Sequence, residues 1–488
     1  MSLAEKAGKA GSLILFRKIW GGLVNLAVMA YLARTLDQTD FGIIAISSTF
    51  IGFMQILCTG GIGDYIIFNN EDDQKKLRNA AFWLNLLLSC IVIILVLVVG
   101  PIWTKQFHDD RIQNIIYLLL IGFLGGIMSM IPKAIFSKEL HFAPLVKIET
   151  TVGTLSQIFQ VILAFSGFGV YSIVLPTAIF APIIAFLYFY KSKFRPSFKT
   201  LNISYWKSIF SYSKNIIGSQ LLNKIVSEGD TIFIGKLLGL HALGVYDISF
   251  KLANLFNTHL LPIVSSIAMP VFSKNKTDIH QVGRHYIQFI ELIGFVFIPL
   301  FGFMEYGAHS IFQILYGIKW LDAVVPFQVL LIFSIFRSLS SPTSGLFNAL
   351  GKPQINFWAT IALVPFIFSS IFYFSQFGLI AVCFAVTISR VSNSIVKIFI
   401  VKKLLILNSK AMMKALIFPI SLIFLIAPLA LIESYLNKML FLSLYFPSYI
   451  LLYFFLFKKD LHKKFILLLK LMPTSKLKIK AENYLMSI

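Results

Sequence analysis

Charge and cysteine are both scarce in this sequence. Only 13% of its 488 residues are Asp, Glu, Lys or Arg, whereas soluble domains hold about 25%. The three cysteines lie singly in apolar runs, so neither a disulfide framework nor a zinc site is expected. The sequence has no HxxxH or HExxH spacing, no phosphate-binding loop and no defensible Ser/His/Asp set. These absences exclude a soluble enzyme, and we expect no enzymatic activity and no cofactor.

Apolar residues, in contrast, are abundant. Hydrophobic side chains make up 57% of the chain, and a membrane helix needs about 20 mostly apolar residues. The sequence therefore predicts an all-α polytopic membrane protein with about 14 transmembrane helices and no room for a soluble domain. The predicted spans are 12–34, 41–68, 79–104, 112–136, 143–167, 170–190, 208–238, 242–272, 285–315, 323–350, 355–376, 378–401, 412–432 and 439–457.

The basic residues indicate how the chain is oriented. The formal net charge is +22, from 43 Lys and Arg against 21 Asp and Glu. With the N-terminus in the cytoplasm, alternate loops hold 29 basic residues inside and six outside. Because cytoplasmic loops collect Lys and Arg, both termini are predicted to be cytoplasmic, and nucleic acid is not expected as a partner. The basic, partly amphipathic tail 458–488 is predicted to lie on anionic membrane lipids.

The sequence resembles itself at an offset near 202 residues. Residues 32–43 align with 234–245, and Gly42 matches Gly244. Six predicted spans separate the copies, so both enter the membrane in the same direction, and such halves bracket a substrate site near the midplane. Chance similarity of apolar segments is the alternative. The repeat predicts two parallel-related six-helix bundles around a central cavity, 1–200 and 201–408, followed by two additional transmembrane helices, 409–457, and a cytoplasmic tail, 458–488.

The seventh predicted span carries a polar stripe. Its members follow one another at i, i+3, i+4, i+7 and i+8 and share one helix face: Gln220, Asn223, Lys224, Ser227 and Glu228. Because charge inside a bilayer is costly, this face is expected to line water or substrate. Lys224 and Glu228 lie one turn apart, so an internal salt bridge that merely satisfies both residues is the alternative.

Polar residues also gather in the first and eighth predicted spans. The eighth span places four of them on one face, Asp247, Lys251, Asn254 and Thr258, and the first span carries Arg17, Lys18 and Asn25. These positions are candidates for lining the same cavity. For Arg17 and Lys18, snorkelling to the cytoplasmic surface explains the sequence equally well.

The remaining candidates are single residues. Asp64 in the second predicted span follows Gly60, Gly61 and Gly63, which break the helix or permit close packing. Arg337 and Arg390 lie alone in apolar spans and are weaker candidates for the cavity. Lys133 is assigned to a cytoplasmic loop, and Glu149 is expected to be interfacial.

Several motifs resemble one family of membrane proteins. Residues 227–246 followed by Phe250–Asn254 resemble the seventh and eighth spans of polysaccharide flippases, and Ala33–Gly42 with Gly61–Asp64 carries the companion pattern. Gly317–Trp320 and Leu350–Pro353 also fit. The chain is therefore similar to the multidrug/oligosaccharidyl-lipid/polysaccharide exporter superfamily, and within it to Wzx-type lipopolysaccharide and exopolysaccharide flippases with fourteen spans.

The resemblance implies a function and a substrate. It implies a cavity that opens alternately to each side and moves a polyprenyl-diphosphate-linked oligosaccharide from the inner to the outer leaflet of the bacterial inner membrane. Basic side chains would neutralise the diphosphate, whereas acids would bind sugar hydroxyls or a coupling ion. The basic candidates are Lys224, Lys251, Arg17 and Lys18, with Arg337 and Arg390 weaker, and the acidic ones are Glu228, Asp230, Asp247 and Asp64.

The driving force and two other functions stay open. An inside-negative potential favours outward movement of an anion by about 2.3 kcal/mol per charge per 100 mV, and exchange against protons or sodium is the alternative. A polysaccharide polymerase is a candidate partner. A small-molecule exporter of the same superfamily would need an acid-dominated lumen, and the third candidate function is a membrane scaffold with an inactive cavity. Buried bases and acids are roughly balanced here, which favours an anionic lipid head group.

Overall fold

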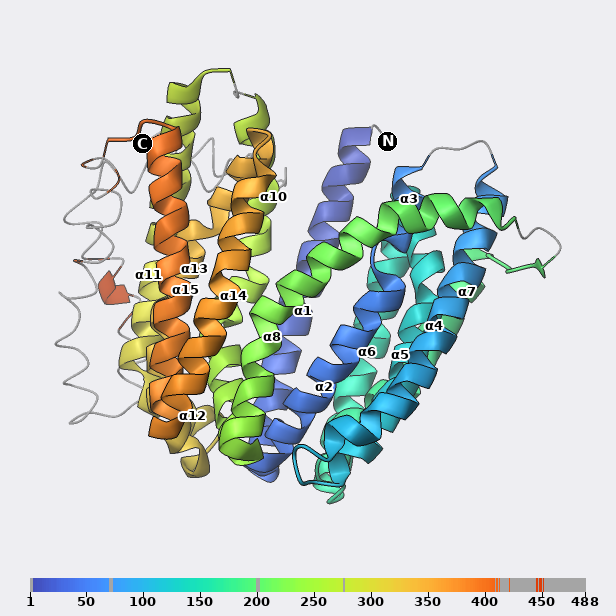
Figure 1. Cartoon of the computed structure of the whole chain (residues 1–488), viewed down its shortest axis with the longest axis horizontal. Coiled ribbons are helices and arrows are strands. Elements are labelled where there is room, and N and C mark those ends of the chain that lie inside the picture. Colours follow the sequence, from blue (N-terminus) through green and yellow to red (C-terminus); the bar gives the residue numbers. More distant parts are fainter. Residues whose placement is uncertain are drawn as a thin grey trace. The chain divides into compact units, whose positions relative to one another are not determined.

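The computed structural model describes residues 3–69, 73–198, 202–274 and 277–408, with a few isolated positions further on, and every regular element in these ranges is a helix (Figure 1). Ten of these helices are long and apolar enough to cross a membrane. The chain is therefore a multi-pass membrane protein. The spans predicted at 412–432 and 439–457 and the tail 458–488 lie outside the described residues, so the total of fourteen spans stays a prediction.

The chain divides into two compact units, which we call unit 1, Met1–Asp247, and unit 2, Ile248–Ile488. The boundary falls within one long helix, α8. Unit 1 contains α1 (Leu3–Thr35), α2 (Gln38–Thr59), α3 (Ile62–Phe68), α4 (Gln74–Thr104), α5 (Arg111–Lys138), α6 (Phe142–Phe165), α7 (Tyr171–Ser192) and most of α8 (Ser204–Ala253). The domain bounds at residues 200 and 408 stay predictions.

Unit 2 takes the last residues of α8 and the helices that follow. These are α9 (Leu255–His259), α10 (Leu261–Lys274), α11 (Ile279–Tyr306), α12 (Ala308–Leu315), η2 (Ile318–Ala323), α13 (Val324–Ala349), α14 (Pro353–Phe374), η3 (Ser375–Phe377) and α15 (Leu379–Leu404). Apart from breaks within some spans, helices occupy the first twelve predicted spans to within a few residues.

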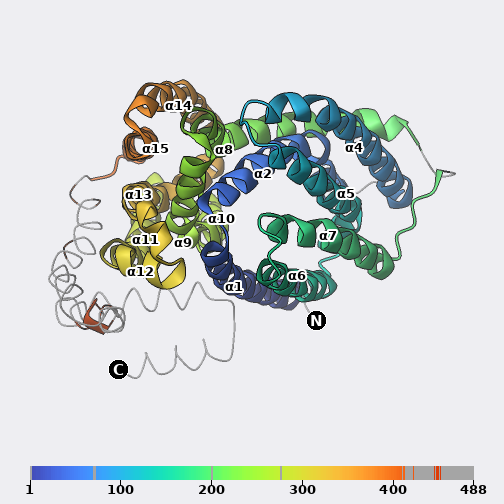
Figure 2. The ribbon, with the colours of Figure 1, turned by 90° about the horizontal axis from the view of Figure 1, so that it is seen from below.

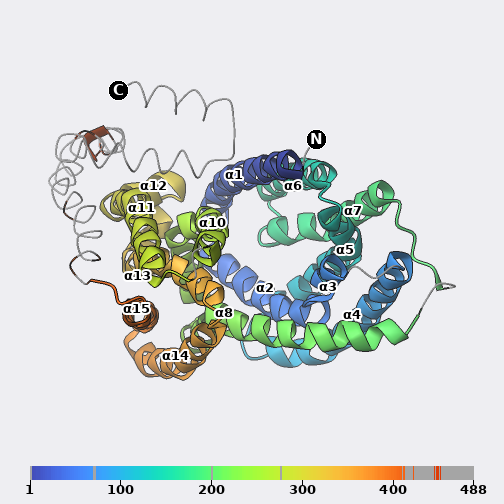
Figure 3. The same cartoon turned by 90° about the horizontal axis from the view of Figure 1, so that it is seen from above.

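The two units pair their helices in the same way. In unit 1, α5 packs against α2, α4 and α7, and α7 packs against α6, which also lies beside α1 (Figure 3). In unit 2, α13 packs against α10, α11 and α15, and α15 packs against α14 (Figure 2). The central helices α5 and α13 are the fourth and tenth predicted spans, and both carry an internal proline, Pro132 and Pro342. The internal repeat predicted from the sequence is therefore confirmed as a repeat of structure.

Equivalent helices also start with equivalent caps. The Asp73 side chain accepts a hydrogen bond from the backbone N–H of Lys76 at the start of α4, and Asp278 accepts one from Gln281 at the start of α11. Such caps satisfy backbone N–H groups that have no partner within the helix. Hydrogen bonds from the side chain and backbone of Lys76 lower the pKa of Asp73, so this cap keeps its charge at mildly acidic pH.

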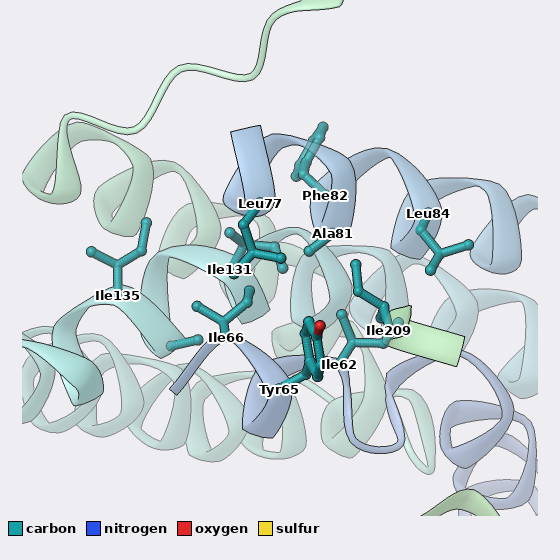
Figure 4. Close-up of a cluster of buried hydrophobic side chains, with 11 residues drawn as sticks. Ile62, Tyr65, Ile66, Leu77, Ala81, Phe82, Leu84, Ile131, Ile135 and Ile209 are labelled. Carbon is teal, nitrogen blue, oxygen red and sulfur yellow. The ribbon is translucent and has the colours of Figure 1, made fainter. Parts of the chain in front are cut away.

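A buried apolar cluster joins four helices of unit 1 (Figure 4). It draws Ile66 from α3, Leu77 from α4, Ile131 from α5 and Ile209 from α8, all fully buried. Tyr212 of α8 stacks on Phe68 with ring centroids 5.7 Å apart. This packing fixes the beginning of α8 against the cytoplasmic ends predicted for α3 and α4.

Glycine residues with positive φ interrupt the helices at two places. The second span divides into α2 and α3 at Gly60–Gly61, where Gly61 has a φ of +81°. In α8, Gly239 has a φ of +86°, a backbone conformation that other residues rarely adopt. Gly239 separates the seventh predicted span from the eighth.

The eighth predicted span is not continuous, which corrects the expectation of one helix over 242–272. Helix α8 ends at Ala253, and Asn254 and Leu260 interrupt the regular structure on either side of the short helix α9. Pro262 explains the second interruption, because proline has no N–H to continue a preceding helix. Asn254 thus lies at a break, where its side chain is available to other helices.

Gly42 and Gly244, the two glycines that match in the repeat, lie against each other in unit 1. A Cβ atom on Gly42 would overlap the backbone oxygen of Leu240, and one on Gly244 would overlap that of Gln38. In the repeat, which has an offset of 202 residues, Gly42 corresponds to Gly244 and Gln38 corresponds to Leu240. The two contacts are therefore equivalent, and α2 and the end of α8 cross about a local twofold axis. Only glycine allows the two backbones to approach so closely.

This crossing gives a prediction about stability. Gly42→Ala and Gly244→Ala are each expected to lower the free energy of unfolding by about 1–3 kcal/mol, because the added methyl group must push two backbones apart. Gly153→Ala is the control, since a Cβ there meets nothing within 4 Å. Thermal unfolding in detergent measures the difference. Equal melting temperatures for the three variants would show that the backbones do not touch.

Candidate functional site

In unit 1, Glu149 on α6 is the meeting point of three other helices. Arg17 on α1 forms an ion pair with its carboxylate, and the Lys133 Nζ on α5 lies 2.7 Å from Oε1. The Tyr188 hydroxyl on α7 donates a hydrogen bond of 2.8 Å to the same oxygen. The Glu149 side chain is only 17% exposed. One carboxylate therefore serves two cations, and the cluster keeps a formal charge of +1 that an anion can neutralise.

The sequence interpretation missed three of the four members of this Glu149 cluster, including Tyr188. Glu149 is an interhelical ion-pair partner whose interfacial position stays a prediction, and Lys133 belongs to α5 rather than to a loop. Arg17 reaches Glu149, so it has a partner inside unit 1. The available signal was that Glu149 is the one acid in the predicted span 143–167, and a lone intramembrane acid calls for a partner.

The polar stripe of α8 forms the ion pair that its spacing predicts. Lys224 Nζ lies 2.6 Å from Glu228 Oε2, and the Thr49 hydroxyl of α2 donates to the same carboxylate oxygen at 3.3 Å. Lys224 passes directly over Gly52, whose missing side chain leaves room for it. The two charged side chains are still 21% and 36% exposed. The pair exists, and its lining of a cavity stays a prediction.

The other candidates of unit 1 are placed individually. Asp230 is buried and accepts a hydrogen bond of 2.6 Å from the Tyr246 hydroxyl. Asn25 and Asp64 are exposed, on α1 and in the first turn of α3, and Lys18 and Asp247 are half-buried. Within the stripe, Asn223 and Ser227 are exposed and Gln220 is half-buried.

In unit 2, two arginines share one aromatic ring. The Arg390 guanidinium lies 5.0 Å from the centroid of Phe333 and 5.1 Å from that of Phe250, and Arg337 lies 6.0 Å from Phe333. The two phenylalanine rings stack at an angle of 17°. Asn254, at the break after α8, accepts a hydrogen bond of 3.1 Å from Arg337. We call these five residues the arginine cluster.

The arginine cluster contains one buried and one exposed guanidinium group. Arg390 is buried, with 6% of its surface exposed, whereas Arg337 is exposed. Aromatic faces stabilise a cation by about 0.5–2 kcal/mol, less than a carboxylate in the same place. Within the described part of the chain, no carboxylate forms an ion pair with Arg337. Two guanidinium groups of this kind bind phosphate oxygens in bidentate fashion.

The structure brings together only part of the predicted set in unit 2. Arg337 and Asn254 are bonded, and Arg390 joins them through Phe333. Lys251 is exposed, one turn before Asn254. Phe250 and Phe333 were missed, because phenylalanine is so frequent in this sequence that single positions carry no signal.

No group of three His, Cys, Asp or Glu side chains that could hold a metal ion occurs in the parts of the chain with defined placement. The clusters described above are suited to binding. Their cations can bind an anionic group, and their hydroxyl and amide groups can bind a polar, uncharged group.

Comparisons with known proteins add family relationships. A family model described as "Polysaccharide biosynthesis protein" matches residues 31–325. The teichuronic acid biosynthesis protein TuaB of Bacillus subtilis is 24% identical over 400 residues, 81% of this chain and 82% of that protein. The lipopolysaccharide biosynthesis protein WzxC of Escherichia coli is 23% identical over 412 residues, 83% and 82% of the two chains.

One solved structure extends the comparison to the fold. The lipid II flippase MurJ in an inward closed conformation superposes with a TM-score of 0.72 at 16% identity, and the match covers 94% of this chain and 99% of that one. At this identity the likeness concerns the fold. The predicted all-α transporter architecture is therefore confirmed.

Proposed function

The chain belongs to the polysaccharide biosynthesis protein family, and from this membership we propose that it moves a polyprenyl-diphosphate-linked oligosaccharide from the inner to the outer leaflet of a bacterial cytoplasmic membrane. Movement occurs by alternating access. The relatives named for lipopolysaccharide and teichuronic acid biosynthesis support a glycan as cargo, and the match to a lipid II flippase supports a lipid carrier.

The arginine cluster is the observation that carries this proposal. A diphosphate brings at least two negative charges into the membrane, where each needs a partner. Arg337 and Arg390 present two guanidinium groups around Phe333, and Arg337 is held there by an aromatic ring and an amide, with no carboxylate ion-paired to it among the described residues. An incoming phosphate therefore need not displace an acid from Arg337.

Unit 1 contributes further cations for the diphosphate. Arg17 and Lys133 share the single carboxylate of Glu149, and Lys224 is bound to Glu228. Each pair can exchange its carboxylate for a phosphate oxygen at little electrostatic cost, because one anion replaces another. The carboxylate that is released then accepts hydrogen bonds from sugar hydroxyls.

The proposal includes an orientation and a driving force. Both termini face the cytoplasm, as the excess of Lys and Arg in alternate loops indicates. The lipid tail stays in the bilayer while the head group crosses, and an inside-negative potential favours the outward step of an anion. A proton or sodium ion bound at one of the acids is the alternative source of energy.

A cation exporter of the same superfamily is supported less well. Its lumen would have to attract positive charge, so acids without partners should dominate the polar clusters. Glu149 and Glu228 are instead both ion-paired, and Arg337 has no ion pair within the described helices. The balance of charge in the two units thus favours an anionic head group.

Deletion and complementation in the host cell test the proposed function. Deleting the gene is expected to abolish the surface glycan and to accumulate the lipid-linked oligosaccharide in the inner leaflet, and the wild-type gene should reverse both effects. Loss of the glycan without accumulation of its lipid-linked precursor would contradict transport. The assay is quantification of surface glycan together with thin-layer chromatography of extracted lipids.

Lys224→Ala provides the matching residue test. Glu228 then loses its partner and the cargo loses one cation, so we expect about tenfold less surface glycan, which corresponds to about 1.4 kcal/mol. Lys105→Ala, which removes an exposed lysine just after α4, is the control. Wild-type export by Lys224→Ala, at equal protein levels in the membrane, would remove Lys224 from the mechanism.

A further inference from the structure

The exposed face of α8 between residues 211 and 228 contains no apolar side chain. Its exposed positions are all polar or glycine: Ser211, Lys214, Asn215, Gly218, Ser219, Asn223 and Ser227. Helix α4 shows the opposite pattern, since it exposes Leu87, Ile91, Ile94, Leu95, Leu97 and Val98. The surface of α4 suits lipid tails, and this surface of α8 does not.

Five of these side chains repeat at every fourth residue. Ser211, Asn215, Ser219, Asn223 and Ser227, which we call the polar row, place one hydroxyl or amide group on each successive turn. A helix rises about 1.5 Å per residue, so the row extends for about 24 Å. This length is most of the roughly 30 Å of hydrocarbon in a membrane.

The polar row has side-chain donors and acceptors that bind no other helix among those described. The hydroxyls of Ser219 and Ser227 donate only to carbonyl oxygens of their own helix, at 2.9 and 3.2 Å. The side-chain amides of Asn215 and Asn223 have no hydrogen-bond partner among the residues that the structure describes. Polar groups left in this state against lipid tails would each cost free energy. The row must therefore face water or a polar ligand.

A groove of about 750 Å³ lies at one end of the polar row. Among the described residues its lining comes from α8: Lys207, Ser208, Ser211, Tyr212, Asn215 and Ile216. Ligand sites in proteins usually measure about 300–1,000 Å³ and combine an apolar or aromatic surface with a few polar groups. The first two members of the row thus lie in a space large enough for part of a small molecule.

We infer that the polar row is the binding surface for the sugar part of the cargo. The row is formally uncharged, and its groups both donate and accept hydrogen bonds, as sugar hydroxyls do. Its regular spacing offers similar partners on successive turns of α8, so a glycan can exchange one set of hydrogen bonds for the next as it advances. This inference rests on the proposed function and assigns the sugar to α8 and the diphosphate to the arginines and lysines.

Binding of two probes by protein in nanodiscs tests this assignment. One probe is the lipid-linked oligosaccharide extracted from the deletion strain, and the other is undecaprenyl diphosphate, which carries no sugar. The Ser219→Leu/Ser227→Leu variant is expected to bind the first probe about tenfold more weakly than wild type, and the second equally well. Ser369→Leu/Ser370→Leu on α14 is the control, because those hydroxyls also bond only to their own helix.

The outcomes separate this inference from the proposed function. Unchanged binding of the glycan lipid by the α8 variant, or an equal loss for both probes, would overturn the role of the polar row while leaving transport in place. If the wild-type protein binds neither probe, the proposed function is wrong and the inference is wrong with it.

Labelling provides a measurement that does not require a folded double variant. In protein whose exposed native Cys90 is replaced by serine, Asn223→Cys is expected to react with a hydrophilic maleimide in membranes, whereas Leu222→Cys reacts at least about tenfold more slowly. An unreactive Asn223→Cys would show that the row faces lipid or protein, and the inference would fail.

Discussion

Replacing Arg337 and Arg390 together by glutamine is expected to lower glycan export at least about 100-fold. Each guanidinium forms charge-assisted hydrogen bonds to phosphate worth about 1.5–3 kcal/mol, and every 1.4 kcal/mol is a factor of ten in affinity. Glutamine keeps a polar side chain of intermediate size, so Asn254 retains a donor. Surface glycan and transport by reconstituted protein measure the effect.

Two further variants isolate the role of the arginine cluster. Lys397→Gln removes one half-buried charge from the same helix, α15, two turns after Arg390, and should leave export within about twofold of wild type. Arg337→Gln alone changes an exposed side chain, so the fold should be retained even if the change at buried Arg390 disturbs packing. Full export by Arg337→Gln and by the double variant would refute a diphosphate site in unit 2.

Glu149→Gln is expected to destabilise unit 1 by about 1–3 kcal/mol, because it leaves Arg17 and Lys133 facing each other without their shared carboxylate. The full penalty of an unpaired buried charge does not apply, since the Lys133 side chain is half exposed. Glutamine still accepts the hydrogen bond from Tyr188, so the loss of stability measures the contribution of the negative charge alone. Thermal unfolding in detergent gives the size of the effect.

Glu139→Gln is the matched control for that change. Glu139 also pairs with an arginine of unit 1, Arg78, but its side chain is 51% exposed, and such surface pairs contribute about 0–1 kcal/mol. Arg17→Gln is then combined with each glutamate variant in a double-mutant cycle. We expect a measurable coupling energy between Arg17 and Glu149, and almost none between Arg17 and Glu139. Equal melting temperatures for the two glutamate variants would mean that Glu149 does not join α1, α5 and α7.

The sequence was sufficient for the fold because a bilayer restricts the possibilities so strongly. An apolar stretch of membrane-spanning length must be helical, so the first twelve predicted spans fall on helices. The match of Gly42 to Gly244 identified the repeat, and the same two glycines touch in the structure. The break at Asn254 was not foreseen, because a polar residue in an apolar span can be tolerated within a helix.

The candidate site was predictable only where its contacts are local. Lys224 and Glu228 are one turn apart, so their ion pair follows from helix geometry alone. Glu149 and Lys133 come from different helices, as do Arg337 and Arg390, and a single sequence gives no distance between helices. The polar row of α8 was partly visible, since Asn223 and Ser227 belong to the predicted stripe, but its extension to Ser211 required knowing which faces are exposed.

Transport in proteoliposomes tests the central claim most directly. The purified chain is reconstituted with the fluorescent lipid-linked oligosaccharide on one side, and a membrane-impermeant glycosidase on the other side reports arrival of the glycan. We predict arrival that depends on the protein, needs no nucleotide, and is faster when the starting side is electrically negative. Arrival no faster than in liposomes without protein, or with the Arg337→Gln/Arg390→Gln variant equal to wild type, would contradict the account.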